Sequence, residues 1–527
     1  MQGRGSVIGL AGLVQNNGQL RAFKGSENAT AVAVSGQFNN TLTGRIEVTH
    51  LTVASGGTVA SEGGFLLGGF RVNPGDPLVL VCAFAVPCPQ TGFTIDAGGL
   101  IAVAALAPML NFGDGQILGT LNNAGSFLGR NGTNTTGGTP YAQTLTVGRD
   151  PVHGVGSGQV INSGSFELQR GNTLRNFSAV SNSCTFTLAG GRYESPDLGV
   201  FVNIGNVVID SGGQLIANRT PGYDALGNSL AAVVNNGSIV VDWNASLHNG
   251  WMMKLLRLGP VPPELTVRAG GTLTQAGGAQ LALVGGQMRV EGSVTGGEIT
   301  LDSLDGNIGG LHIDPGGSVS VYSYRQTDGV LTVNGTLTGQ VTLSGGDLTG
   351  GGDGSRINGD VFFAGAGGGP RPAPPKCGNS FYACFRPGNS PGAVTIDGEL
   401  QMGDNSLLEL EVQRDAAGAL HWDTVHATSM RCDGGSTIRL VVAEGAAGSD
   451  WTNLDLLRCN AGCDLGGARF EIVGAADGWI FDGSAGGLSF ALAPVPEPGS
   501  AALLVAGLGL LGWTWLRRPC PGGATPV

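Results

Sequence analysis

Few acidic and basic side chains in this sequence are spaced for catalysis. Cleavage of a sugar polymer needs two carboxylates, or a carboxylate with an arginine or lysine, on one surface. The nearest groupings are Asp302 with Asp305 and Asp150 with His153, and no two aspartates are adjacent. Many other aspartates lie in or beside glycine-rich turns, which their side chains stabilise. We therefore expect no catalytic residue and no cofactor.

Two other groupings contain side chains that bind metal ions. Residues 350–354 (GGGDG) are similar to one fragment of a calcium-binding nonapeptide roll, but that motif must repeat several times to form a site. His421 and His426 are five residues apart, which directs their side chains to opposite faces of a strand. No Cys-x2-Cys or His-x3-His spacing occurs. We therefore expect no metal site.

The nine cysteines are too few for a disulfide scaffold in a chain of this length. Six of them form three close pairs, which in an exported protein we interpret as candidate disulfides at loops, with free thiols as the alternative. These pairs are Cys82 with Cys88, Cys377 with Cys384, and Cys459 with Cys463. The cysteines without an obvious partner are Cys184, Cys432 and Cys520.

The composition describes a weakly charged chain that turns often. Glycine accounts for 95 of the 527 residues, more than double an average usage of about 7%. The apolar fraction of 41% excludes a fully disordered chain. The net charge is −12 and the basic residues are scattered, so a nucleic-acid partner is not expected.

The glycines belong to a short repeat. A β-branched residue or leucine, one or two polar residues, glycine and another apolar residue recur from 53–59 (VASGGTV) to 333–337 (VNGTL). Glycines 164, 190, 212 and 237 are separated by 26, 22 and 25 residues, and glycines 270, 292, 316 and 335 by 22, 24 and 19. The 42 residues between Gly56 and Gly98 are interpreted as two units. A period of this size indicates a solenoid.

The repeat unit has the pattern of strands. Apolar and polar residues alternate in segments such as Leu331-Thr332-Val333, and β-branched residues are common. A unit of about 22 residues accommodates three short strands and three corners, whereas a β-propeller blade needs about 40 residues. The predicted fold is all-β, with a parallel β-helix over residues 1–365.

The region after these repeats divides into three parts. Residues 366–391 are rich in glycine and proline and are predicted to be a loop or linker. Residues 392–492 are predicted to form the last coils and a β-rich cap, which covers an otherwise exposed sheet edge. Residues 493–527 contain a predicted transmembrane helix over 499–516, because this span has no charge and a helix of that length covers about 27 Å.

The two ends of the chain bear on export. The N-terminus shows no basic and apolar signal peptide, so the chain is either cytoplasmic or lacks its native start. At the other end, Trp513 and Trp515 suit a membrane interface, and Arg517 and Arg518 place the following residues in the cytoplasm. The body is then expected outside the membrane.

This C-terminal segment resembles the PEP-CTERM sorting signal of Gram-negative bacteria. The match consists of the four-residue motif, the apolar span and the arginine pair: Val495, Pro496, Glu497, Pro498, Arg517 and Arg518. A nine-residue tail after Arg518 is longer than is usual in that family. The resemblance implies processing by exosortase, a membrane transpeptidase-like protease. It also implies an exported protein, anchored in the inner membrane as a precursor and then found at the cell surface or in the extracellular matrix. Met1 is accordingly not expected to be the native start.

Residues 387–398 (PGNSPGAVTIDG) resemble an element near the end of the extracellular β-helices of autotransporter passengers. The two resemblances together imply a non-enzymatic structural or adhesive protein, with extracellular polysaccharide as a candidate partner. One alternative is a polysaccharide-acting lyase or hydrolase on the same fold. Another is an ice- or polysaccharide-binding protein, which requires a flat face of regularly spaced threonines. Only the pairs Thr144/Thr146 and Thr272/Thr274 suggest such a face.

Overall fold

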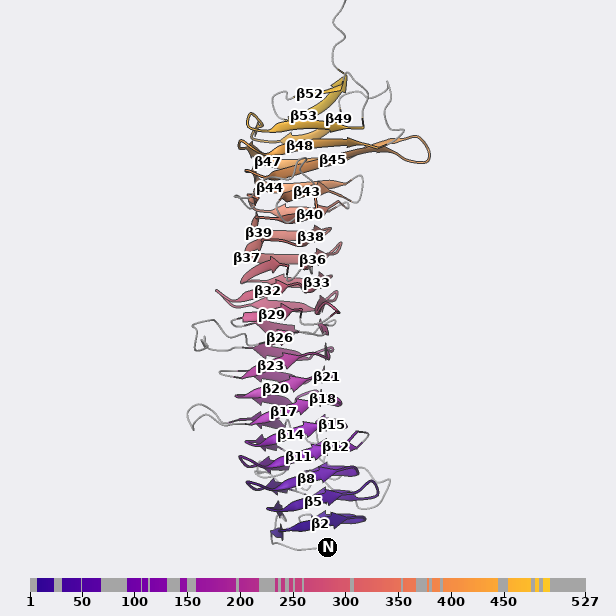
Figure 1. The fold of residues 1–527 in the computed structure, drawn as a ribbon, viewed down its shortest axis with the longest axis vertical. Coiled ribbons are helices and arrows are strands. Elements are labelled where there is room, and N and C mark those ends of the chain that lie inside the picture. Colours follow the sequence, from indigo (N-terminus) through magenta and orange to yellow (C-terminus); the bar gives the residue numbers. More distant parts are fainter. Residues whose placement is uncertain are drawn as a thin grey trace, which may run out of the picture.

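The computed structural model describes the chain in segments. The described residues are 7–22, 31–48, 50–67, 92–105, 107–111, 114–129, 143–148, 158–195, 199–217, 233–235, 238–241, 246–249, 252–257, 260–303, 308–351, 354–365, 377–378, 382–388, 392–443, 454–474, 479–482 and 487–492. Within these residues every regular element is a strand. The strands stack along one long axis, from β2 near the N-terminal end to β52 at the other (Figure 1).

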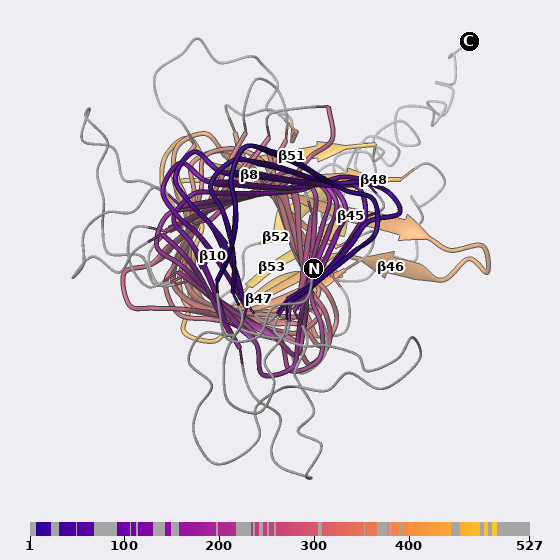
Figure 2. The ribbon, with the colours of Figure 1, turned by 90° about the horizontal axis from the view of Figure 1, so that it is seen from below.

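Most coils of the stack have three short strands, and most strands pair in parallel with their counterparts one coil away. Seen along the axis, the coils superimpose around a common centre (Figure 2). The strands therefore form three faces. The first face contains β1 (Ile8–Leu10), β4 (Ala31–Val34), β7 (His50–Val53), β10 (Gly92–Ile95), β13 (Asp114–Ile117), β16 (Thr144–Val147), β19 (Thr173–Asn176), β22 (Arg192–Ser195), β25 (Gln214–Ala217), β28 (Ser246–Asn249), β31 (Thr272–Gln275), β34 (Ser293–Thr295), β41 (Arg356–Asn358) and β49 (Leu454–Cys459).

The second and third faces are likewise built from strands that pair from coil to coil. The second face contains β2 (Leu13–Asn16), β5 (Gln37–Asn40), β8 (Thr58–Ser61), β11 (Leu100–Val103), β14 (Thr120–Asn123), β17 (Gln159–Asn162), β20 (Ala179–Asn182), β23 (Val200–Asn203), β26 (Val233–Asn235), β29 (Met252–Leu256), β32 (Gln280–Val284), β35 (Glu298–Asp302), β42 (Val361–Phe363) and β50 (Cys463–Asp464). The third face contains β3 (Gln19–Ala22), β6 (Arg45–Val48), β9 (Gly64–Leu67), β12 (Pro108–Asn111), β15 (Ser126–Gly129), β18 (Ser165–Gln169), β21 (Thr185–Ala189), β24 (Asn206–Ile209), β27 (Ser238–Val241), β30 (Glu264–Val267), β33 (Gln287–Val290), β36 (Gly310–Ile313), β38 (Val330–Val333), β40 (Gly346–Gly350), β43 (Ala383–Pro387), β45 (Ser406–Arg414), β48 (Thr437–Val442) and β51 (Arg469–Val473).

Four longer strands contribute to both the first and the second face, and three strands complete the C-terminal end. The longer strands are β37 (Ser318–Gln326), β39 (Thr336–Leu343), β44 (Ala393–Met402) and β47 (Thr424–Cys432). At the end, β46 (Leu420–Trp422) pairs antiparallel with β45, while β53 (Gly487–Leu492) pairs antiparallel with β49 and with β52 (Trp479–Asp482). Antiparallel strands at this end cover the edge of the first face beyond β49.

The core lies inside the coils, because alternate residues of each strand point inward. In-register pairing places equivalent side chains on top of one another. Phe127, Phe166 and Phe186 occupy the same position on three neighbouring strands of the third face. Their rings stack with centroids 4.3 and 4.9 Å apart, and all three side chains are buried. Burial of such aromatic stacks stabilises the coil in both directions along the axis.

Asparagines form a second internal column where the second face turns into the third. Asn123, Asn162, Asn182 and Asn203 end successive strands of the second face and are fully buried. Their side chains bond from one coil to the next at 2.8, 2.6 and 2.7 Å. Asn162 also donates to the main-chain oxygen of Thr185, at 2.9 Å. The column therefore connects successive coils through side-chain hydrogen bonds and donates to main-chain oxygens near the corner.

Glycine is required at the corners for two reasons. Gly212 has a φ of 77°, a conformation that other residues rarely adopt. Gly213 is not among the glycines with a positive φ, but a Cβ there would lie 2.3 Å from the oxygen of Leu188 on the preceding coil. The predicted repeat glycines fall at two different corners: Gly164 follows the second face, whereas Gly190 follows the third.

The interpretation of the 42-residue spacing as two units is wrong. The main-chain N–H of Gly56 donates to the oxygen of Gly98 at 3.2 Å, and β7 pairs in register with β10. The two glycines therefore lie one coil apart. The spacing is long because the segment between β9 and β10 adds residues to one coil without adding strands to the described part of the stack.

The predicted loop or linker at 366–391 includes one strand in the described part of the chain. Ala383–Pro387 forms β43, which pairs with β40 on one side and β45 on the other. The ring of Phe385 is buried and stacks on Phe363 at 5.8 Å. Residues 383–387 therefore belong to a coil, and Phe385 contributes to its core.

The all-β prediction and the parallel, solenoidal arrangement of strands are confirmed. No helix in the described part of the chain is long and apolar enough to cross a membrane. The predicted transmembrane helix over 499–516 lies outside the described residues.

Candidate functional site

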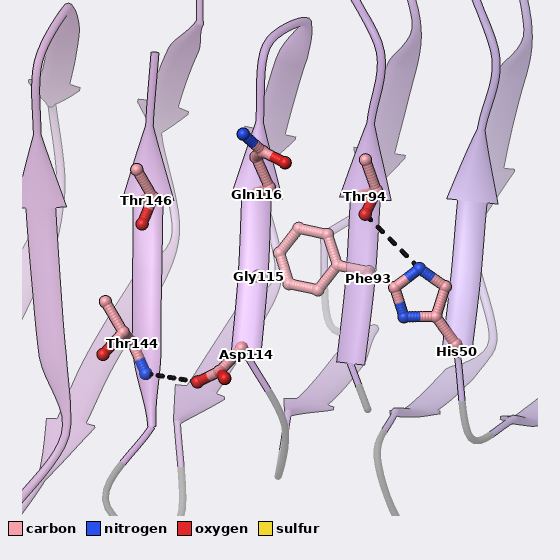
Figure 3. Close-up of a pocket in the computed structure, with 8 residues that line it drawn as sticks. All are labelled: His50, Phe93, Thr94, Asp114, Gly115, Gln116, Thr144 and Thr146. Atoms are coloured by element: carbon pink, nitrogen blue, oxygen red, sulfur yellow. Dashed lines mark hydrogen bonds between the residues drawn. The ribbon is translucent and has the colours of Figure 1, made fainter. Parts of the chain in front are cut away.

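A groove of about 450 Å³ lies on the outer surface of the first face, over β7, β10, β13 and β16 (Figure 3). It combines hydroxyl, amide, imidazole and carboxylate groups. Its lining residues are His50, Phe93, Thr94, Asp114, Gly115, Gln116, Thr144 and Thr146.

Strand register brings these distant residues together in two rows. In one row Gly92 pairs with His50 on one side and Asp114 on the other. In the adjacent row Thr94 pairs with Gln116, which lies next to Thr146. Gly92 therefore lies between His50 and Asp114 in this row and contributes no side chain there.

The floor of the groove depends on a small inward-facing residue. Gly115 lies between Phe93 and Leu145, both of which are buried. A Cβ on Gly115 would lie 2.3 Å from Cδ1 of Leu145 and 2.9 Å from Cε1 of Phe93. The two larger side chains therefore occupy the volume that a side chain at position 115 would take.

Hydrogen bonds orient the polar lining. Nε2 of His50 lies 3.3 Å from Oγ1 of Thr94, and the main-chain N–H of Thr144 donates to Oδ1 of Asp114 at 2.8 Å. Figure 3 shows the hydroxyl of Thr94 and the amide of Gln116 beside each other on neighbouring strands. The lining residues that the structure describes include one carboxylate, Asp114, whereas glycoside hydrolysis uses a pair.

Further along the same face, eight hydroxyl side chains form two straight columns, which we call the hydroxyl array. They occupy the outward positions of β31, β34, β37 and β39, and pair in register from coil to coil. Successive members of a column are about 4.8 Å apart, the spacing of paired strands. The array consists of Thr272, Thr274, Ser293, Thr295, Ser318, Ser320, Thr336 and Thr338. The predicted pair Thr272/Thr274 belongs to this array, whereas Thr144/Thr146 lines the groove.

Two of the candidate disulfides are present in the structure. Cys377 is bonded to Cys384 and Cys459 to Cys463, with Cα atoms 5.5 and 5.6 Å apart. The second bond connects the end of β49 to the start of β50, so it closes the corner between the first two faces. Cys82 and Cys88 lie outside the described residues.

Asp347, Cys377 and Cys384 place their ligand atoms within 4.8 Å of one another. The two sulfurs are joined in a disulfide, so neither is a thiolate that could bind a metal ion. Asp347 instead forms an ion pair with Arg386 and accepts the N–H of Gly378 at 3.0 Å. This cluster fastens the region around β43 to β40.

Two cysteines in the described part of the chain are free thiols. Cys184 is exposed at a corner, and Cys432 is buried at the end of β47. Burial raises the pKa of Cys432 to about 11, which keeps it protonated and unreactive at neutral pH.

The structure separates the histidines that were considered as metal ligands. His421 lies on β46 and its Nε2 is 3.0 Å from Oδ2 of Asp415, whereas His426 lies on β47. Hydrogen bonding to His421 and to the main chain lowers the pKa of Asp415. Asp302 is exposed at the end of β35. Asp305, Asp150, His153 and Asp353 lie outside the described residues.

Asp423, which lies between these histidines in the sequence, is a buried carboxylate with a structural role that the sequence did not predict. Oδ1 of Asp423 accepts the N–H of Gly392 at 2.7 Å, and Oδ2 accepts the N–H of Glu411 at 2.8 Å. Burial raises the pKa of Asp423 to about 7, although the two hydrogen bonds act in the opposite direction. Asp423 therefore ties the starts of β44 and β47 to the middle of β45. An aspartate followed by Thr-Val in the sequence carries no sign of this role.

The C-terminal residues of the chain match a known sorting motif. Residues 494–518 match the family model described as the PEP-CTERM protein-sorting motif. The chain carries a PEP-CTERM sorting signal. The match includes the positions predicted from sequence, Val495 to Pro498 with Arg517 and Arg518, which lie outside the described residues. A PEP-CTERM signal at this position indicates export and sorting to the envelope surface.

The other comparisons add little to this signal. No curated protein matches the chain. Among solved structures, it is similar to the crystal structure of a TibA fragment that was hyper-glycosylated by TibC, with 15% sequence identity and a TM-score of 0.19. That likeness covers 75% of this chain and 97% of the TibA fragment. The fold described above therefore rests on the strand pairings of this chain.

Proposed function

We propose that this protein is an exported, non-enzymatic structural or adhesive component of the cell envelope or extracellular matrix. The observation that carries this proposal is the PEP-CTERM motif at 494–518, which directly follows a long stack of parallel coils. A solenoid of this kind has a large surface for its mass and grows without a new core, which suits a scaffold.

In this proposal the precursor is a parallel β-helix with a β-rich cap, held in the inner membrane of a Gram-negative bacterium by a transmembrane helix over 499–516. Exosortase processes the chain near residues 495–498, and the ectodomain then reaches the cell surface or matrix. The uncharged span and the arginine pair after it support this orientation.

The non-enzymatic part of the proposal is supported by the groove. Among the lining residues in the described part of the chain, Asp114 is the one carboxylate. A retaining or inverting glycosidase uses two carboxylates about 5–10 Å apart. A lyase or hydrolase on this fold remains the rival hypothesis, and release of reducing or unsaturated sugars from a polysaccharide panel would support that rival.

A fusion experiment tests the sorting. Residues 493–527 joined to a periplasmically exported reporter should anchor it in the membrane of an exosortase-bearing host, and a shorter, processed form should then appear. Replacing Pro496, Glu497 and Pro498 with alanine should block processing while the apolar span still anchors the reporter. A reporter that is neither membrane-associated nor processed would refute the proposal.

Ice binding is a second candidate function, favoured by the hydroxyl array. Its two columns pair in register from coil to coil, which supports a regular spacing of hydroxyl groups along this face. If the array binds ice, Thr274→Leu and Thr295→Leu should abolish inhibition of ice recrystallisation, whereas Thr300→Leu, on the second face, should not. Absence of inhibition by the unaltered protein excludes this function.

A further inference from the structure

We propose that Arg175 and Arg192, on the outer surface of the first face, bind the carboxylates of an acidic polysaccharide that contains uronic-acid units. This inference deepens the proposed function, since it assigns a ligand class to one surface of the exported solenoid. It rests on the balance of charges at this place, on how the two guanidinium groups are held, and on the hydroxyl side chains beside them.

Strand register places both arginines beside one carboxylate. Arg175 on β19 pairs with Glu194 on β22, and Arg192 is the first residue of the same strand β22. Nε of Arg175 lies 3.4 Å from Oε2 of Glu194, and Nε of Arg192 donates to Oε1. Two cations therefore share one anion. This leaves a positive charge in excess on the surface of a chain whose net charge is −12.

The charged residues at the neighbouring corners do not reverse this balance. Arg170 lies at the corner before β19 and Asp210 at the corner before β25, and both are exposed. Because they carry opposite charges, together they leave the local excess unchanged. Asp197 lies outside the described residues. The other positions that pair with the two arginines are uncharged: Thr146, Thr173 and Gln214.

Contacts within the protein hold both guanidinium groups in place. The guanidinium of Arg175 lies over the ring of Phe177, 5.6 Å from its centroid, and Phe177 is itself buried. Nη1 of Arg192 donates to Oε1 of Gln214 at 2.9 Å. Restricting these long side chains in advance reduces the entropy that a ligand would otherwise lose on binding.

The same contacts leave several N–H donors for a ligand. An arginine has five such donors. Within the described part of the chain, the terminal nitrogens of Arg175 and Nη2 of Arg192 form no hydrogen bond. The two side chains are 48% and 44% exposed, so these donors are accessible from solvent. A planar guanidinium matches a carboxylate with two parallel hydrogen bonds.

The neighbouring side chains favour a carbohydrate over other polyanions. Thr144, Thr146 and Thr173 occupy outward positions next to the arginines, and their hydroxyls can donate and accept as sugar hydroxyls do. A double-stranded nucleic acid carries one charge about every 1.7 Å and binds through the neutralisation of many phosphates. Two arginines cannot provide this. A uronic acid instead presents one carboxylate together with hydroxyl groups, which is the combination that this surface complements.

Calorimetric titration of the full-length protein in detergent at pH 7 and low salt tests the inference. The probe is tetragalacturonate, and its methyl ester is the matched neutral ligand. Tetraglutamate and a thymidine tetranucleotide are anions without uronic sugars. Tetragalacturonate should bind saturably and more tightly than the other three. Arg175→Gln and Arg192→Gln should each raise its Kd about five- to tenfold, because each removes charge-assisted hydrogen bonds to the ligand.

Arg356→Gln is the matched control and should leave Kd unchanged. Arg356 is an exposed arginine of the first face whose charge is balanced by Asp397. It lies seven coils from Arg192, about 34 Å along the axis. Thermal unfolding followed by circular dichroism verifies that each variant is folded.

Four results would overturn the inference. These are no binding of tetragalacturonate, equally tight binding of any other probe, unchanged binding by either folded variant of Arg175 or Arg192, and an equal loss of binding in Arg356→Gln. None of them depends on sorting, which the reporter fusion tests separately, so failure of this inference can be distinguished from failure of the proposed function.

Discussion

The side-chain nitrogen of Asn123 lies 2.8 Å from the side-chain oxygen of Asn162, its counterpart one coil further along the solenoid. Both residues are fully buried. The same nitrogen lies 2.9 Å from the main-chain oxygen of Ser165. One amide group therefore links two coils and also donates to a main-chain oxygen. We expect these hydrogen bonds to stabilise the coils in addition to the packing of the side chains.

Asn123→Ala should lower the free energy of unfolding by about 1–3 kcal/mol, because it removes the donor to the buried side-chain oxygen of Asn162. Asn122→Ala is the matched control, since Asn122 is exposed on the same strand and should change stability by less than about 0.5 kcal/mol. Urea unfolding followed by circular dichroism measures both. Equal effects of the two substitutions would show that the column does not stabilise the coils.

Gly115→Ala should destabilise the protein by about 1–3 kcal/mol through overpacking. The added methyl group would lie 2.3 Å from Cδ1 of Leu145, inside the core beneath the groove. Adding Leu145→Ala to Gly115→Ala should relieve part of the clash and give a non-additive double-variant effect. Gly277→Ala is the control, because nothing lies within 4 Å of that site. Thermal unfolding that is unaffected by Gly115→Ala would contradict this packing.

Because of Asp423, the free energy of unfolding should decrease as the pH rises from about 4 to about 7. Burial raises its pKa in the folded protein to about 7, above the ordinary value of 3.8, so the folded state holds a proton that the unfolded state has lost in this interval. Stability decreases with pH wherever the folded state binds more protons. Asp423→Asn removes this titration while one side-chain oxygen remains as an acceptor.

The measurement is the urea midpoint of both proteins at pH 4, 5.5 and 7.5. The stability of the unaltered protein relative to Asp423→Asn should decrease from the first pH to the last. A difference between the two proteins that stays constant with pH would mean that Asp423 does not titrate in this interval.

The disulfide between Cys377 and Cys384 should stabilise the region around β43. Cys384 lies within this strand, next to Phe385, and the bond closes a short loop. Replacing both cysteines with serine should cost about 2–3 kcal/mol. Hydrogen exchange should increase first in β43 and its partner β40, and not in the N-terminal coils. Non-reducing peptide mapping checks the bond directly and also tests the predicted bond between Cys82 and Cys88.

The local sequence pattern was sufficient to predict the class of fold. Alternation in Leu331-Thr332-Val333 predicts a strand with two buried residues, and the structure buries Leu331 and Val333. The repeated glycines predict frequent corners, because positive φ angles and close backbone approach both exclude side chains. Such features depend on residues that are neighbours in the sequence, so they can be recognised without the structure.

Which strands pair between coils could be determined only from the tertiary structure. Coil length varies with the insertions at corners. Spacing alone therefore predicted that Gly56 and Gly98 lie two coils apart, although they lie on neighbouring coils. The same variation hid β43 inside a glycine- and proline-rich region. Packing across the whole core sets the register between strands. An average repeat length in the sequence does not show which residues pair.

The candidate site shows the same division. The PEP-CTERM signal could be recognised directly, since its motif, apolar span and arginines are contiguous. The groove could not, because His50, Thr94, Asp114 and Thr144 belong to four different coils. The sequence by itself determined that this chain forms strands, turns often and is sorted by its C-terminus. Only the tertiary structure decided which side chains share a surface, because non-local hydrogen bonding between coils fixes which residues align.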